Sequence, residues 1–189
     1  MSNQQLLDQI ASQIQNCKIC KTNKTGSPVP GEGNADARIA FIGEAPGRTE
    51  SQTGKPFVGR SGQYLTKLIE SIGLNRKNVY ITSPVKYFPI DKNGKGRAPT
   101  PAEIAHGKTH LAKQLTIINP KVIVLLGNTA ARSLLPNPIQ VSKSHGIPIE
   151  SHPIFFPTYH PAAAIRFAKN RPIIETDFQK LKHLISPPR

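Results

Sequence analysis

Short apolar runs alternate with amphipathic stretches along most of the chain. Mostly apolar runs at 37–42, 79–82, 121–126 and 153–157 predict buried strands. Apolar residues at helical spacing, together with start and stop signals, predict helices at 3–16, 63–74, 101–118, 130–135, 162–169 and 177–184. Strands that alternate with helices in this way predict an α/β fold with a mainly parallel sheet, and 189 residues without a linker predict one domain over 1–189.

The longest glycine-rich stretch, GEAPGRTESQTGKPFVGRSG at 43–62, connects the first predicted strand to a predicted helix. Glycines at such a turn let backbone N–H groups approach a ligand, and a helix start favours an anion. An ordinary long loop would look similar, but Glu44, Glu50 and Phe57 favour a site. This loop, Ser83 and His160 each follow a predicted strand, so a parallel sheet would bring them to one edge.

The residue types at this edge point to one kind of chemistry. The chain lacks a GxxxxGK[ST] loop, a GxGxxG fingerprint and a GxSxG elbow. A histidine can donate a hydrogen bond to developing negative charge, and a carboxylate can position water or stabilise an oxocarbenium-like centre. An aromatic ring can stack on a base. Together these groups suit cleavage of a nucleotide's glycosidic bond, with the base extruded into a pocket.

The charge of the chain favours a polyanionic partner. Lysine and arginine exceed aspartate and glutamate by 14, which places nucleic acid ahead of an anionic membrane, although a merely soluble basic surface would carry the same charge. The apolar run at 122–126 is too short to span a bilayer, and residues 1–15 do not have the pattern of a secretory signal. We therefore expect an intracellular, cytoplasmic protein with reduced thiols.

Cys17 and Cys20 form a CxxC pair directly after the first predicted helix. The pair is half of many metal sites, but a metal needs about four ligands and the chain has no other cysteine. Two reduced thiols at a helix end are an equally good interpretation.

Several motifs together resemble the uracil-DNA glycosylase superfamily, most closely its family 4, over nearly the whole chain. They are VPGEGN (29–34), the loop at 43–62, VYIT…K (79–86), PTPAEI (99–104), PKVIVLLG (120–127) and TYHPAAAIR (158–166). The resemblance implies a three-layer α/β/α domain with four parallel strands. It also implies a substrate, DNA containing uracil or another deaminated base. A monomer without membrane attachment would excise this base in base excision repair.

The resemblance also assigns roles to individual residues. Glu44 and Glu50 match the family's acidic residues, Phe57 matches the ring that stacks on the flipped uracil, and His160 matches the histidine that faces uracil O2. We expect Glu50 to act on the attacking water and Glu44 to shape the pocket. The remaining substrate-binding positions are Gly43, Ala45 and Ser83; Ala45 stands where a better-known glycosylase family carries its water-activating aspartate.

The chain departs from family 4 in the residue that reads the base. The family usually has asparagine at the position of Ser83, and a serine hydroxyl is shorter and rotates. Losing a bidentate contact costs roughly 1–3 kcal/mol of discrimination. We therefore expect weaker uracil specificity, or acceptance of another base such as hypoxanthine.

A second departure concerns the family's [4Fe–4S] cluster. Cys17 and Cys20 match two of its four cysteines, but Tyr87 and Gly107 occupy the other two positions. We therefore predict no cofactor and no metal. His106 and His110 lie near the lost fourth position and leave zinc as an alternative.

The third departure is the minor-groove wedge, where the family tends to have leucine and this chain has Ala164 followed by Ile165. A smaller wedge would favour single strands or mismatches. The residues that we predict to contact DNA are Gly59, Arg60, Ser61, Lys86, Arg97, Ile165 and Arg166.

Two other functions are compatible with these residues. The departures would also fit a catalytically weak or inactive DNA-binding protein of glycosylase ancestry. A small-nucleotide hydrolase would fit the pocket but would not explain so basic a chain.

Overall fold

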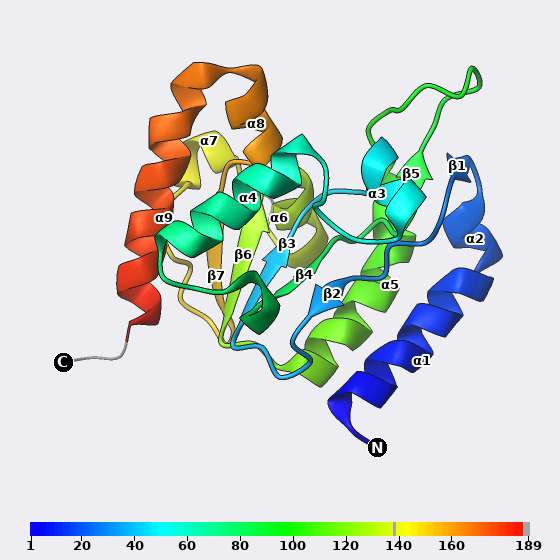
Figure 1. The fold of residues 1–189 in the computed structure, drawn as a ribbon, viewed down its shortest axis with the longest axis horizontal. Coiled ribbons are helices and arrows are strands. Elements are labelled where there is room, and N and C mark those ends of the chain that lie inside the picture. Colours follow the sequence, from blue (N-terminus) through cyan, green and yellow to red (C-terminus); the bar gives the residue numbers. More distant parts are fainter. Residues whose placement is uncertain (138, 187–189) are drawn as a thin grey trace.

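The central sheet of the computed structural model has five strands within the described residues, 1–137 and 139–186 (Figure 1). Their order is β2-β4-β3-β6-β7, with bounds Glu32–Gly33, Tyr80–Thr82, Ile39–Ile42, Val122–Leu126 and Ile154–Thr158. Neighbouring strands are parallel, except that β2 pairs antiparallel with β4. The predicted α/β fold is confirmed, but the predicted number of four strands is one too low. The missed strand, β2, is two residues long and carries no apolar pattern.

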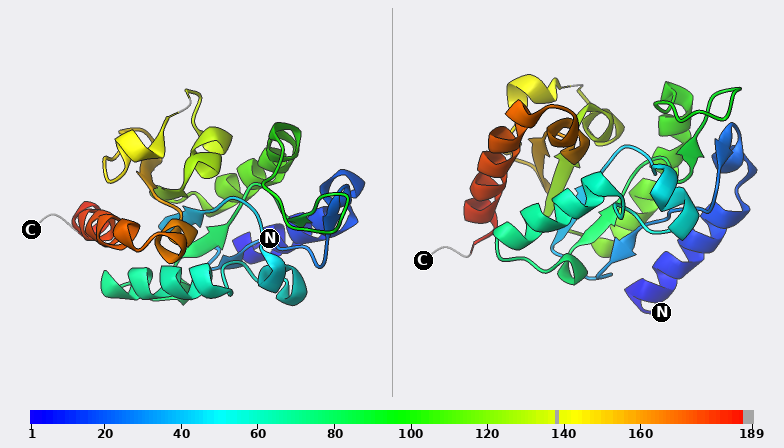
Figure 2. Two further views of the ribbon diagram at one scale, coloured as in Figure 1. Left: turned by 90° about the horizontal axis from the view of Figure 1, so that it is seen from above. Right: turned by 45° about the horizontal axis from the view of Figure 1, so that its top comes forward.

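Helices cover both faces of the sheet, which gives the predicted three layers (Figure 2). α4 (Arg60–Ser71), α8 (Pro161–Arg166) and α9 (Arg171–Ile185) pack on one face. α1 (Asn3–Asn16), α5 (Pro101–Ile118), α6 (Asn128–Leu134) and α7 (Val141–Ser144) belong to the other side. The two apolar clusters follow from the alternation of side chains along each strand: Phe41 and Val124 face α4 and α9, whereas Ile42 and Leu125 face α5 and α6.

Residues at its two ends set the bounds of α5 (Pro101–Ile118). Thr100 caps the helix and accepts a hydrogen bond from the Glu103 N–H at 3.3 Å, while the Glu103 carboxylate accepts one from the Thr100 N–H at 2.7 Å. This capping box starts the helix at the predicted residue. Asn119, in the left-handed conformation, ends it before Pro120.

Several short elements lie inside segments that the sequence presents as loops. They are α2 (Lys18–Lys21), α3 (Arg48–Thr53), the 3-10 helix η1 (Arg76–Asn78), and a small antiparallel pair, β1 (Lys24–Thr25) with β5 (Phe88–Pro89). Each of these elements is too short for its apolar residues to show the periodicity of a helix or a strand. The helix predicted over 162–169 is divided between α8, which ends at Arg166, and the 3-10 helix η2 (Ala168–Asn170). Within the described residues, no helix has the length and apolar character needed to cross a membrane.

Candidate active site

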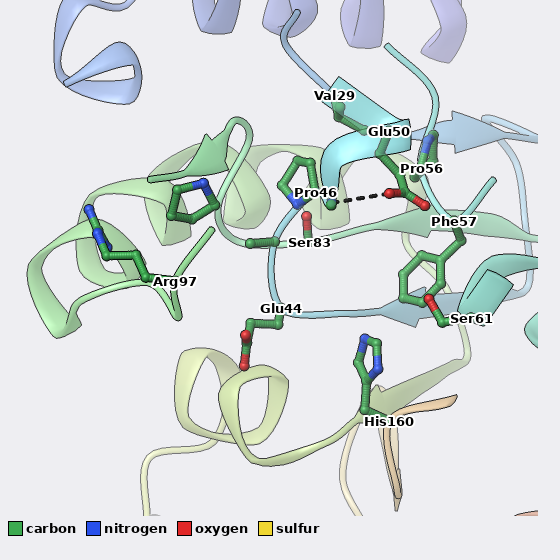
Figure 3. A pocket seen from close by; sticks show the side chains of 13 residues that line it. Val29, Glu44, Pro46, Glu50, Pro56, Phe57, Ser61, Ser83, Arg97 and His160 are labelled. Atoms are coloured by element: carbon green, nitrogen blue, oxygen red, sulfur yellow. Dashed lines mark hydrogen bonds between the residues drawn. The ribbon is translucent and has the colours of Figure 1, made fainter. Parts of the chain in front are cut away.

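A cavity of about 220 Å³ opens where the segments after β3, β4 and β7 meet (Figure 3). It lies beyond the carboxyl ends of these parallel strands, the edge where α/β sheets bind ligands. Typical small-molecule sites measure about 300–1,000 Å³, so this cavity has room for little more than one base. Its lining includes predicted residues from all three segments: Glu44, Ala45, Glu50, Phe57, Ser61, Ser83, Arg97 and His160.

Phe57 is held in an unusual backbone conformation at one side of the cavity. Its φ is +50°, in the left-handed region that non-glycine residues seldom adopt. A Cβ on Gly62 would lie 1.9 Å from the carbonyl of Phe57, and a Cβ on Gly43 would lie 2.7 Å from its ring. Both glycines therefore make room for this aromatic residue, whereas from the sequence we expected the loop's glycines to let backbone N–H groups approach a ligand.

His160 faces Phe57 from the start of α8. The two rings stack with centroids 5.5 Å apart and an interplanar angle of 29°. His160 Nδ1 accepts the backbone N–H of Ala162 at 3.1 Å, so the neutral ring carries its proton on Nε2. Burial lowers the pKa of His160 below its ordinary value of 6.5, and the nearby carboxylates of Glu44 and Glu50 only partly oppose this. The site therefore presents a neutral Nε2–H donor.

Glu50 is buried, and its carboxylate binds backbone. It accepts N–H groups from Gly47 at 3.1 Å, from Val58 at 3.0 Å and from Gly59 at 2.8 Å. These bonds tie the start of α3 to the segment that carries Phe57. Glu50 thus fixes the shape of the loop.

Glu44 lies half-buried and points towards α6. Its Oε2 accepts the hydroxyl of Thr129 at 2.5 Å, while Oε1 makes no hydrogen bond within the described part of the chain. The sequence did not identify Thr129, because the two residues are 85 positions apart. Glu44 therefore has an oxygen available to a molecule in the cavity.

Ser83 lies at the edge of the cavity with 5 % of its surface exposed. Its hydroxyl donates to the carbonyl of Val85 at 2.8 Å. A hydroxyl has one proton and two lone pairs, so Ser83 can still accept a hydrogen bond from a base. Donating one would require breaking the bond to Val85.

The prediction that Lys86 contacts DNA is wrong. The residue is 1 % exposed, and its ammonium donates to Pro30 O at 3.1 Å, Thr82 Oγ1 at 2.7 Å and Gln114 Oε1 at 2.7 Å. Burial lowers its pKa to about 7. Lys86 therefore connects the VPGEGN segment, β4 and α5 from inside the protein through these hydrogen bonds. Gln114 is the partner that sequence reasoning missed.

Arg97 is also not a free cation, although it lines the cavity. Its guanidinium donates to both carboxylate oxygens of Glu103 at 2.8 Å and to the carbonyls of Ile90, Ala98 and Asn23. All five N–H donors of an arginine are thereby occupied. Lys24 adds a further contact to Glu103 at 3.0 Å. Arg97 therefore belongs to an ion cluster with Glu103 and Lys24, and its side chain is 25 % exposed. Its predicted phosphate contact stays a prediction.

The remaining predicted DNA contacts lie at the starts and ends of helices. Gly59 caps α4, but its N–H already donates to Glu50, whereas Arg60 is exposed and Ser61 lines the cavity. On α8, Arg166 is exposed and Ile165 is half-buried. Ala164 is fully buried in the core, so it is no wedge. Phe167, which the sequence did not single out, is 52 % exposed just beyond it.

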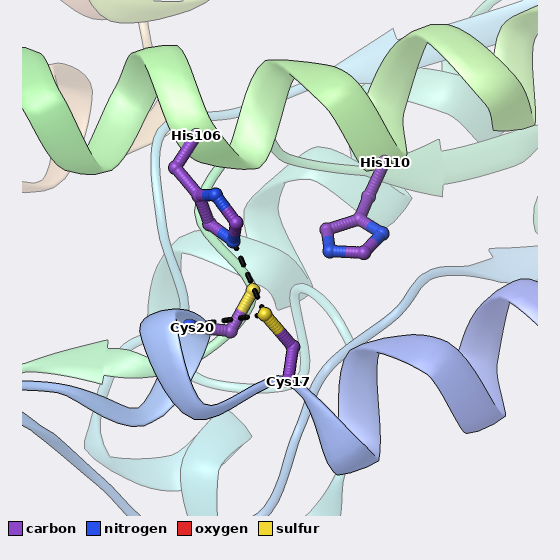
Figure 4. A group of neighbouring side chains, drawn as sticks. All are labelled: Cys17, Cys20, His106 and His110. Atoms are coloured by element: carbon purple, nitrogen blue, oxygen red, sulfur yellow. Dashed lines mark hydrogen bonds between the residues drawn. The ribbon is translucent and has the colours of Figure 1, made fainter.

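The prediction that the chain has no metal or cofactor site is overturned by a second group of side chains. Cys17, Cys20, His106 and His110 bring four ligand atoms within 4.8 Å of one another (Figure 4). These residues do not fit a [4Fe–4S] cluster held by four cysteines, because the chain contains only two. They do form a donor set of the kind that binds a metal ion.

Comparisons with known proteins agree with this architecture. Residues 30–182 match the family model described as the uracil DNA glycosylase superfamily. The chain is 38 % identical over 191 residues to the type-4 uracil-DNA glycosylase of Thermotoga maritima, covering 97 % of both chains. It is 40 % identical over 191 residues to that of Saccharolobus solfataricus, covering 95 % of this chain and 87 % of the relative. The crystal structure of wild-type Pedobacter heparinus SMUG2 superimposes with a TM-score of 0.60 at 17 % identity, covering 95 % and 97 % of the two chains. The resemblance predicted from the motifs is confirmed: the chain belongs to the uracil-DNA glycosylase superfamily and is similar to its type-4 members over nearly its whole length.

Proposed function

We propose that the chain is a monofunctional uracil-DNA glycosylase that flips a deaminated base from DNA and hydrolyses its N-glycosidic bond in base excision repair. The observation that carries this proposal is the convergence of Phe57, a neutral His160 and Glu44 around a cavity of about 220 Å³. The type-4 relatives named above carry uracil-DNA glycosylase in their names, which supports the same substrate.

In this proposal, each group acts on a different part of the nucleotide. The extruded base packs against the Phe57 ring, and the Nε2–H of His160 donates to the carbonyl oxygen that gains negative charge as the bond to the sugar breaks. Water adds to the sugar carbon, and its proton passes to a carboxylate. The electron pair of the broken bond stays with the departing base.

We further propose that Glu44, and not Glu50, acts on the water. The three backbone N–H groups on Glu50 support this division, because a carboxylate so occupied has little freedom to take a proton. Glu44 has a free oxygen beside the cavity, and Thr129 holds its other oxygen in place. This reverses the assignment made from the sequence.

The DNA would lie across the rim formed by the start of α4 and the end of α8. Arg60 and Arg166 are exposed there, and the net charge of +14 favours the phosphate backbone. Ile165 and Phe167 are the apolar side chains at the end of α8 that could occupy the gap left by a flipped base.

The activity is tested directly with labelled oligonucleotides, single- and double-stranded, that contain one uracil, hypoxanthine or xanthine. We expect an alkali-sensitive abasic site at uracil. Salt-sensitive binding without any abasic product would instead indicate a DNA-binding protein that no longer catalyses.

Ser83→Asn should increase uracil excision. An asparagine amide offers both a donor and an acceptor to the base edge, whereas the Ser83 hydroxyl already donates its only proton to the carbonyl of Val85. A contact worth about 1–3 kcal/mol corresponds to a rise of about 5- to 150-fold in kcat/KM for uracil. Single-turnover rates on uracil and hypoxanthine measure the change, and a variant with unchanged preference would contradict this role for Ser83.

The pH dependence should follow the lowered pKa of His160. Because the buried ring stays neutral below its ordinary value of 6.5, the Nε2–H donor remains uncharged at all higher pH values. We expect the acid limb that His160 contributes to kcat/KM for uracil to lie below pH 6.5 and to be missing in His160→Ala. A limb above 6.5 would mean that the group titrating there is not this histidine.

A further inference from the structure

Two distant segments supply the four metal-ligating side chains beside α5. Cys17 ends α1 and caps α2, and Cys20 lies within α2. His106 and His110 are four residues apart on α5, which places both on the side of the helix that faces the cysteines (Figure 4). The Sγ of Cys17 lies 3.2 Å from the Nε2 of His106, and all four ligand atoms lie within 4.8 Å of one another.

His110 gives an independent indication that a ligand belongs here. The residue is 8 % exposed, and both of its buried ring nitrogens lack a hydrogen-bond partner within the described residues. Burying such a group unpaired costs about 1–3 kcal/mol. A metal ion bound between the cysteines and this ring would satisfy one of the two nitrogens.

The donors favour one tetrahedral ion. Zinc binds thiolate at about 2.3 Å and imidazole at about 2.0–2.1 Å, so ligands on one tetrahedral ion lie about 3.3–3.8 Å apart. The observed spacing approaches this range, and small side-chain rotations would complete it. The sequence spacing, Cys-x2-Cys with His-x3-His, is also one that structural zinc sites use.

A four-iron cluster would need a different arrangement, since each of its ligands binds a separate iron. A Cβ on Gly107 would lie 2.0 Å from the carbonyl of Pro84, so a cysteine at this position requires α5 to move. Tyr87 occupies the other cysteine position, and its hydroxyl lies 3.5 Å and 3.4 Å from the carbonyls of Ile14 and Gln15.

We propose that Cys17, Cys20, His106 and His110 bind a single structural zinc ion in place of the family's iron–sulfur cluster. The ion fastens the corner between α1 and α2 to α5, and this site is independent of the proposed catalytic function. Beside it lies a cavity of about 270 Å³ whose lining includes Cys20, His106 and Arg97. Arg97 also lines the candidate active site, so the two cavities share this residue.

Metal analysis of tag-free, full-length protein purified without added metal tests the proposal. We expect about one zinc per chain, no sulfide and a colourless solution. After removal of the metal, Co²⁺ should bind at one equivalent and give the intense visible bands of tetrahedral cobalt together with thiolate-to-cobalt absorption. Titration of the wild-type protein answers the question even where substituted chains fail to fold.

Cys20→Ser and His110→Gln should both lose the one-equivalent cobalt absorption, and their Tm should no longer fall when a chelator is added. His183→Gln, at an exposed position on α9, is the matched control and should keep both properties. Stoichiometric iron with sulfide, or a wild-type chain that shows no tetrahedral cobalt bands, would overturn the proposal.

Discussion

His160→Ala should lower the single-turnover rate of uracil excision by about 10²–10³-fold, the usual effect of removing one preorganised donor from developing negative charge. The residue is well placed for this effect because the Ala162 N–H fixes its tautomer and Phe57 stacks on its ring. Binding of uracil-containing DNA should change much less, since phosphate contacts supply most of the affinity. Rapid-quench kinetics with enzyme in excess measure the rate, and a binding isotherm under the same salt measures the affinity.

His183→Ala is the control for this experiment, because it removes an exposed imidazole far along α9 and should leave the rate unchanged. Since His160 caps α8, a thermal melt of each variant separates lost chemistry from a displaced helix. Equal losses of rate and DNA affinity would assign His160 to positioning of the DNA and would contradict its role at the leaving base.

Glu44→Gln should reduce the excision rate by about 10²–10⁴-fold, the range for a general base, while leaving Tm almost unchanged. The amide keeps the shape of the side chain and can still accept the Thr129 hydroxyl, but it cannot take a proton from water. Single-turnover kinetics and a melting curve on the same preparation provide the two measurements.

Glu50→Gln should have a different effect, because it replaces a buried carboxylate that accepts three backbone N–H groups. In the glutamine, the side-chain NH₂ group would face a backbone N–H that the carboxylate oxygen had accepted, and neither group can accept a hydrogen bond. We therefore expect a loss of about 1–3 kcal/mol in the free energy of unfolding, with a parallel loss of activity. Glu70→Gln, exposed on α4, serves as the neutral control. A stable Glu50→Gln protein with little activity, beside an active Glu44→Gln protein, would restore the original assignment of Glu50 to water.

The features that the sequence predicted well depend on neighbouring residues. The start of α5 follows from Thr100 and Glu103, three positions apart, and the fully apolar run of β6 forms an interior strand of the sheet, between β3 and β7. Family motifs placed Glu44, Phe57, Ser83 and His160, and all four line one cavity. Their proximity could be expected from the sequence because each follows a strand of the same parallel sheet.

The features that the sequence missed depend on contacts between distant segments. Lys86 looks like a surface cation, yet its acceptors lie on Pro30 and Gln114, 56 and 28 positions away. Cys17 and His106 are 89 positions apart. A signal for the metal site was nevertheless present, since His106 and His110 have the spacing that puts two ligands on one helical face.

The ion cluster around Glu103 has a consequence for behaviour in acid. Hydrogen bonds from Arg97, reinforced by Thr100 and Lys24, hold the pKa of Glu103 at about 2, below its ordinary 4.5. A depressed carboxylate pKa stabilises the fold above pH 4.5, and this stabilisation is lost as the pH falls from there towards 2. Because Arg97 borders both cavities, protonation of this one carboxyl group would loosen the candidate active site and the surroundings of the candidate metal ligands together.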